Sequence, residues 1–104
     1  MIQYNVLDCL SKKVKFTSEI DCEPNTCFRT KRRLAFLWAL KKDIDLVGAD
    51  FSGADLSDVD FSGANLSGVN LSYTILCGAN IQKAKLSGAN LYQAKFSWGS
   101  YAKV

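Results

Sequence analysis

The sequence predicts an all-β solenoid that is preceded by a cap consisting of a β-hairpin and one α-helix. The first observation is a five-residue unit that repeats twelve times between Ile44 and Lys103. The second is the region before residue 44, where apolar residues first alternate with polar ones and then follow a helical spacing. A chain of 104 residues suits one cooperative unit with a single core. We therefore expect a capping region at residues 1–43 and a solenoid at residues 44–104.

The repeat places a large apolar residue at every fifth position and a small or short residue two places before it. Clear copies are residues 53–57 (GADLS), 63–67 (GANLS) and 88–92 (GANLY). A period of five matches neither the 3.6-residue period of a helix nor the two-residue period of a strand. It keeps the large residues on one side only if the chain turns a corner in each unit. These large residues are Leu46, Phe51, Leu56, Phe61, Leu66, Leu71, Leu76, Ile81, Leu86, Leu91, Phe96 and Tyr101.

The pattern of Ala, Asp or Asn, Leu or Phe, Ser and Gly resembles the signature of the pentapeptide-repeat proteins. The resemblance implies a right-handed quadrilateral β-helix with four units in each coil, so that twelve units form about three coils. With neighbouring strands ~4.8 Å apart, the stack would be about 14 Å tall. The four predicted stacks of large residues are Leu46, Leu66 and Leu86; Phe51, Leu71 and Leu91; Leu56, Leu76 and Phe96; and Phe61, Ile81 and Tyr101.

The predicted hairpin begins the capping region. Apolar and polar residues alternate over residues 2–6 and again over residues 14–20, which is typical of half-buried strands. Residues 11–13 (SKK) between them predict a turn. A solenoid needs such a region because its first coil otherwise leaves unpaired backbone groups and an apolar end uncovered.

A helix is expected from Cys27 to Lys42, after a break at residues 23–26 (EPNT). Asn25 and Thr26 are the candidates for its N-cap, since their side chains can accept a hydrogen bond from the first turn. Its apolar side is expected to carry Leu34, Leu37 and Trp38. Because the helix runs directly into the first repeat, we expect it to plug the open base of the coils.

Composition argues against an enzyme. The chain has no histidine, so the commonest general base is missing, and a Cys–His or Ser–His pair cannot form. Four cysteines without histidine give little support to a zinc site, and we expect buried free thiols. The recurring glycines fit repeat corners rather than a phosphate-binding loop. We expect no catalytic residues, no metal and no cofactor.

Charge is distributed in bands along the chain, although the net charge is only +3. Residues 1–42 contain nine Lys or Arg and four Asp or Glu, whereas residues 43–104 contain four Lys and six Asp. No apolar run approaches the 18 residues of a membrane span, and no signal peptide is visible. We expect a cytoplasmic protein that does not enter a membrane.

Three surfaces are candidates for binding. The acidic band precedes or neighbours the large residues of the first coil, where its carboxylates could imitate phosphates. The basic cap surface lies on the predicted helix, and its alternative interpretation is a solvated helix face. No aromatic interleaving strengthens a nucleic-acid role for it. The acidic band consists of Asp45, Asp50, Asp55, Asp58 and Asp60, and the basic cap surface of Arg29, Lys31, Arg32 and Arg33.

The third candidate, the aromatic surface, consists of Tyr73, Tyr92, Trp98 and Tyr101. Exposed aromatic residues are typical anchors of protein interfaces. The family resemblance implies that the C-terminal coil can form a dimer contact. The alternative is that Trp98 and Tyr101 simply seal the last coil.

These observations favour a non-enzymatic protein-binding module. Residues 16–22 together with 37–41 resemble the front end of short pentapeptide-repeat proteins from bacteriophages and prophages, which implies a phage origin. We therefore expect an inhibitor that blocks a host nucleic-acid-handling or defence protein by surface or partial DNA mimicry, as a counter-defence factor. The alternatives are direct nucleic-acid binding through the basic cap surface, protection of DNA gyrase, and a structural or assembly role in the phage particle.

Overall fold

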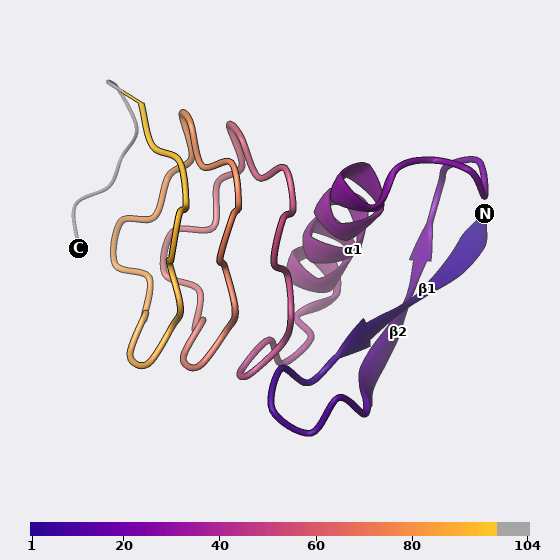
Figure 1. Ribbon diagram of the computed structural model, residues 1–104, viewed down its shortest axis with the longest axis horizontal. Helices are drawn as coiled ribbons and strands as arrows, with labels where there is room; N and C mark the ends of the chain where they lie inside the picture. The colour runs from indigo at the N-terminus through magenta and orange to yellow at the C-terminus, as the bar shows by residue number, and fades with distance from the viewer. Residues whose placement is uncertain (98–104) are drawn as a thin grey trace.

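The computed structural model describes residues 1–97, so Trp98 and Tyr101 lie outside the described residues. Figure 1 shows three parts in sequence order, with the hairpin on one side of the helix and the coiled chain on the other. The helix is therefore the middle layer, although the end of the hairpin also pairs directly with the first coil, where the Asp50 amide bonds the Leu7 carbonyl at 2.8 Å.

The hairpin consists of strand β1 (Ile2–Leu7) and strand β2 (Val14–Ile20), which pair in antiparallel fashion. Ile2 lies opposite Ile20, and the register shifts between Val6 and Leu7. The hairpin agrees with the alternation in the sequence. Its buried side includes Val6, Ser18 and Ile20, and the Ser18 hydroxyl donates a hydrogen bond to the Tyr4 carbonyl at 2.9 Å.

Helix α1 extends from Phe28 to Lys42, which agrees with the predicted helix to within one residue. Its N-cap is Cys27, and no side-chain hydrogen bond caps it. The expectation that Asn25 or Thr26 forms the N-cap was wrong, because the amide of Thr26 bonds the Glu23 carbonyl at 3.0 Å in a preceding turn. Asp43 ends the helix in the left-handed conformation at φ 58°, and the chain then enters the first repeat.

The buried face of α1 differs from the predicted one. The fully buried residues are Ala35, Phe36 and Ala39, whereas Leu37 is exposed and Leu34 is only partly buried. The prediction used the largest side chains, but small alanines let the helix approach the first coil closely. Trp38 is partly buried on the hairpin side, where its ring stacks on Phe16 of β2 with centroids 6.2 Å apart.

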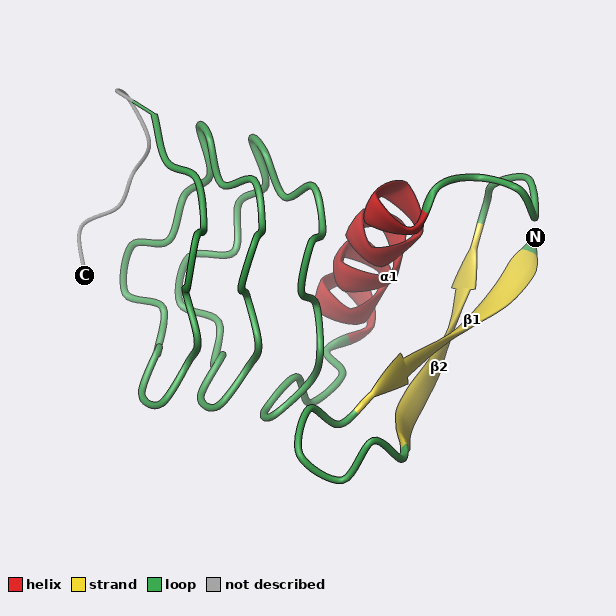
Figure 2. Ribbon diagram, in the orientation of Figure 1, coloured by secondary structure: helices red, strands yellow, loops and turns green. Residues whose placement is uncertain are grey.

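The chain after α1 coils so that residues twenty positions apart pair in parallel. Asp50 pairs with Asn70 and Asn70 pairs with Asn90, and the same offset links Asp55, Ile75 and Lys95. Twenty residues are four units, so this register agrees with the stacks predicted from the sequence. These pairs are isolated bridges rather than extended strands. Within residues 1–97 the extended strands are β1 and β2, as Figure 2 shows by colour.

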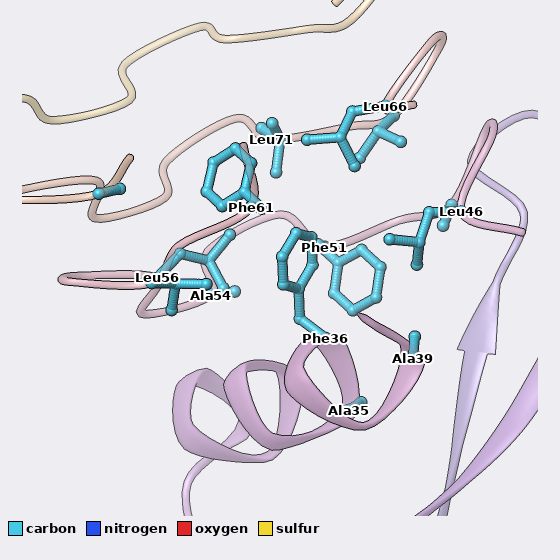
Figure 3. Packing of buried hydrophobic residues seen from close by; sticks show 14 of the residues in the cluster. Ala35, Phe36, Ala39, Leu46, Phe51, Ala54, Leu56, Phe61, Leu66 and Leu71 are labelled. Carbon is cyan, nitrogen blue, oxygen red and sulfur yellow. The ribbon is translucent and has the colours of Figure 1, made fainter. Parts of the chain in front are cut away.

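The core runs from α1 into the coils. The ring of Phe36 meets those of Phe51 and Phe61 edge-on, with centroids 5.0 and 5.4 Å apart (Figure 3). The large residues of the first coil (residues 44–63) and the second coil (residues 64–83) are buried. Burial decreases in the third coil, which is described from residue 84 to residue 97. Leu86 and Leu91 are partly buried, and Phe96 is 43% exposed.

Candidate interaction surfaces

Four residues of the acidic band stabilise the turns of the first coil, because a side-chain oxygen of each accepts the amide two residues later: Asp45, Asp50, Asp55 and Asp60. In the clearest case the Asp55 Oδ1 accepts hydrogen bonds from the Ser57 amide at 3.1 Å and the Ser57 hydroxyl at 2.7 Å. The second coil makes the same turn with an uncharged residue, since Asn65 Oδ1 accepts from the Ser67 amide at 3.2 Å. The turn therefore needs the side-chain oxygen and does not need the negative charge.

The acidic band divides into two groups, according to whether the carboxylate is partly buried beside an arginine of α1 or exposed. Asp50 lies 4.0 Å from Arg32, and Asp55 lies 3.8 Å from Arg33. We call Asp50 and Asp55 the inner acidic pair. The other three residues, the outer acidic group, are Asp45, Asp58 and Asp60, and all three are exposed.

Within the outer acidic group, Asp45 lies 3.9 Å from Lys15 while its own side chain is 75% exposed. Among residues 1–97, no Lys or Arg nitrogen lies within ion-pair distance of Asp58 or Asp60. The outer acidic group therefore presents its charge to solvent, whereas the charge of the inner acidic pair is partly compensated.

Arginines of the basic cap surface bind backbone carbonyls at the edge of the first coil that faces α1. Arg33 Nη1 donates to the Asp55 carbonyl at 3.1 Å and to the Ser57 carbonyl at 2.8 Å. Arg32 Nη1 donates to the carbonyl of Ser52 and, at 3.0 Å, to its hydroxyl. Arg29 and Lys31 also donate to carbonyls, those of Gly53 at 3.1 Å and Pro24 respectively.

These guanidinium groups take the place of a missing coil. The carbonyls of Ser72, Ile75 and Cys77, twenty residues later, accept hydrogen bonds from the amides of the coil below, those of Gly53, Leu56 and Asp58. In the first coil the corresponding carbonyls accept from arginines instead. The side chains thus satisfy an edge that would otherwise be unpaired. Arg32 and Arg33 are only partly exposed, so the solvated helix face considered as an alternative does not describe them.

The two described tyrosines of the aromatic surface lie together on the outside of the coils. Tyr73 and Tyr92 are 55% and 61% exposed, and their rings meet edge-on with centroids 5.7 Å apart. Sequence reasoning missed a third member, Phe28, which is 51% exposed at the start of α1. The sequence signal for it was its position, since Phe28 follows the break at residues 23–26 and directly precedes Arg29 of the basic cap surface. Tyr73 contacts Tyr92, whereas Phe28 and Tyr73 line the same hollow, and the absence of a side chain at Gly53 leaves room for the Phe28 ring.

Comparison with known families decides what kind of chain this is. The model for pentapeptide repeats matches residues 43–72 and 60–97 with eight copies, which together cover more than half of the chain. This chain belongs to the pentapeptide-repeat family. Proteins of this family are generally structural or interaction modules rather than enzymes. The searches of curated proteins and of solved structures gave no match.

The described part of this pentapeptide-repeat protein adds three negative observations. None of its helices is long and apolar enough to cross a bilayer. No group of three or more Cys, Asp or Glu side chains among residues 1–97 is arranged to hold a metal ion. All four cysteines are free, but Cys27 is exposed and the others are only partly buried, so the expectation of buried thiols was wrong.

Acid should destabilise the protein partly through Asp55. Hydrogen bonds from the Ser57 hydroxyl and amide lower the pKa of Asp55, and Arg33 lowers it further. A carboxyl with a lowered pKa stabilises the fold above its unfolded pKa of about 4, and this stabilisation is lost as the pH falls through the folded value. Asp55→Asn keeps the accepting oxygen and removes the titration. We expect thermal unfolding of this variant to depend less on pH between about 5 and 2 than that of wild type; an unchanged pH profile would contradict the assignment.

Proposed function

We propose that this pentapeptide-repeat protein is a non-catalytic protein-binding module whose outer acidic group occupies a basic site on a partner protein. The single observation that supports this most is the division of the acidic band. Asp50 and Asp55 lie at arginines, whereas Asp45, Asp58 and Asp60 are exposed. The backbone at two of them is fixed against the next coil, since the Asp58 amide bonds the Cys77 carbonyl at 3.0 Å and Asp60 pairs with Asn80. Preorganised charges of this kind bind without a large loss of conformational entropy.

The partner we propose is a host protein that handles nucleic acid, and the chain would be a phage-encoded inhibitor that acts by partial DNA mimicry. Duplex DNA presents one negative charge about every 1.7 Å of its axis, so three carboxylates imitate only a short part of it. The mimicry is therefore local, and the target site should be a pocket or groove rather than a long DNA track. A cytoplasmic location in the bacterial host belongs to the same proposal.

The proposed architecture behind this surface is a right-handed quadrilateral β-helix of about three coils with the hairpin and α1 as its cap. The twenty-residue offset of the bridges supports four units per coil. The same offset places Asn80 and Lys85 next to Asp60 and Asn65 of the preceding coil, and Lys95 next to Ile75.

A homodimer through the C-terminal coil is the second association we propose. It is supported by the decreasing burial of the third coil, in which Phe96 is 43% exposed. Sedimentation velocity should show a concentration-dependent monomer–dimer equilibrium that is weakened by Phe96→Asp. A protein that stays monomeric at the highest accessible concentration would contradict the dimer.

The experiment that tests the proposed function is affinity capture from a bacterial lysate, followed by competition with duplex DNA. We expect a captured host protein to be released by DNA and not to be retained by Asp58→Asn/Asp60→Asn. Both substitutions are conservative for the fold, because Asn makes the same turn in the second coil and tolerates the left-handed conformation of residue 58 at φ 60°. If the double variant still captures every partner, the outer acidic group is not the binding surface. If the double variant loses the partner but duplex DNA does not displace that partner from the wild-type protein, the outer acidic group binds without imitating DNA.

A further inference from the structure

We propose that the protein has a second contact site, a basic aromatic notch that binds an acidic segment of a partner protein through one carboxylate and one apolar anchor. The notch is a hollow of about 370 Å³ at a corner of the coils. Its lining consists of Phe28, Arg29, Arg32, Ser52, Gly53 and Tyr73. It uses no residue of the outer acidic group, so this inference goes beyond the proposed function and can fail independently of it.

One wall of the notch is the Phe28 ring, which packs on a corner position that lacks a side chain. A Cβ atom on Gly53 would lie 2.8 Å from Cε2 of Phe28, so a larger residue at position 53 would displace the ring. The amide of Gly53 bonds the carbonyl of Ser72 at 2.8 Å, so Tyr73 lies one coil above it. The hollow lies between the Phe28 ring and Tyr73, with Arg29 and Arg32 of α1 beside it.

Tyr73 stands at a position where stability alone favours glycine. Its backbone is left-handed at φ 60°. Six of the ten equivalent corners among the described residues carry glycine, and the three other exceptions, Asp58, Lys83 and Gln93, are polar, so Tyr73 is the one aromatic residue among them. A bulky residue in this conformation is strained. Burial does not offset the strain, because the Tyr73 side chain is 55% exposed. An exposed aromatic held in a strained conformation beside a hollow points to binding rather than to folding.

The charge of the notch fits a carboxylate. The guanidinium carbons of Arg29 and Arg32 lie 5.7 and 5.3 Å from the centre of the Phe28 ring. An adjoining hollow of about 240 Å³ shares Arg29 and Tyr73 and adds Lys95. Neither hollow is lined by an Asp or Glu of the described residues. Guanidinium groups bind carboxylates through paired hydrogen bonds, and Tyr and Arg are residue types that anchor protein interfaces. Arg32 uses Nε for the Tyr4 hydroxyl and Nη1 for Ser52, whereas Arg29 uses Nη1 for the Gly53 carbonyl, so Arg29 is the arginine that can offer its Nε and Nη2 edge to a carboxylate.

A protein segment fits the notch better than a single-stranded nucleic acid does. Stacking of bases needs a free aromatic face, but the guanidinium groups of Arg29 and Arg32 lie close to the Phe28 ring. The inner acidic pair also lies next to these arginines, with Asp50 4.0 Å from Arg32. A chain of phosphates would meet those carboxylates, whereas one carboxylate between Phe28 and Tyr73 can avoid them.

The test measures binding of synthetic peptides by fluorescence anisotropy. The probe is a heptapeptide library with a central Tyr, Phe or Leu flanked by Asp, Glu, Ser and Gly, and its control replaces Asp and Glu by Asn and Gln. We expect the acidic library to bind at least about tenfold more tightly than the amide library, which corresponds to about 1.4 kcal/mol. Tyr73→Gly should abolish this preference while raising the melting temperature, because it relieves the strained backbone. A variant that binds less although it is more stable cannot owe its loss to unfolding.

The matched control is Lys83→Gly, which makes the same change at a corner with φ 60° outside the notch and also removes one positive charge. Lys83→Gly should raise the melting temperature and keep the preference for the acidic library. Arg29→Gln should lose this preference. The proposal is overturned if the two libraries bind equally or not at all, if Lys83→Gly loses the preference as well, or if single-stranded oligothymidine binds and the acidic library does not.

Discussion

Leu66→Asp should prevent the coils from folding. Leu66 is fully buried between the first and third coils of its stack, and an aspartate there would place an unpaired charge in an apolar core. Burying an unpaired charge costs more than about 4 kcal/mol, a large part of the total stability of a small domain. We expect the variant to show no cooperative thermal transition by circular dichroism, or one at a much lower temperature.

The matched control for this prediction is Asn65→Asp, one residue earlier. Asn65 is exposed, and its Oδ1 accepts the Ser67 amide, which an aspartate can do equally well, as Asp60 does with Ser62. The control should melt close to wild type. If Leu66→Asp melts near wild type too, the assignment of inward and outward positions in the repeat is wrong.

Phe36→Ala should detach the cap from the coils. The Phe36 ring is fully buried against Phe51 and Phe61, and truncation of a buried Phe typically costs about 3–5 kcal/mol. Chemical denaturation should show this loss, and the uncovered first coil should promote aggregation. Leu37→Ala, on the exposed side of the same helix, should cost much less. Equal losses for the two variants would mean that α1 does not plug the coil through Phe36.

The architecture was largely predictable because it depends on patterns with a fixed period. The five-residue period, together with the four units per coil that the family resemblance implies, predicts a twenty-residue register. The bridges of Asp50 with Asn70 and of Asn70 with Asn90 agree with it. Alternation predicted β1 and β2 for the same reason. The buried face of α1 was not predictable in this way, because the helix packs on two sides and its closest approach uses Ala35 and Ala39 rather than large residues.

The candidate surfaces were less predictable because side chains far apart in the sequence share them. The sequence shows an acidic band and a basic run as separate features, whereas in the fold Arg32 and Arg33 lie against Asp50 and Asp55 and bind the carbonyls of their coil. One signal was present, since three of the four basic residues are arginines, whose planar groups suit several carbonyls at once. Phe28 and Tyr73 line one hollow because the coils stack and because Gly53 leaves room for the Phe28 ring, so no local sequence pattern predicts this arrangement.

The proposed function requires that the exposed charge of Asp58 and Asp60 binds the partner, and not the charge of Asp50 and Asp55 that the cap compensates. It is tested most directly by capturing host proteins in parallel with two isosteric double variants, Asp58→Asn/Asp60→Asn and Asp50→Asn/Asp55→Asn. Each removes two negative charges and keeps the oxygen atoms that accept hydrogen bonds in the turns. We expect the first variant to stay folded and to lose the partner, and the second to melt at a lower temperature and to retain it. Retention by both variants, or loss only in the second, would contradict the claim.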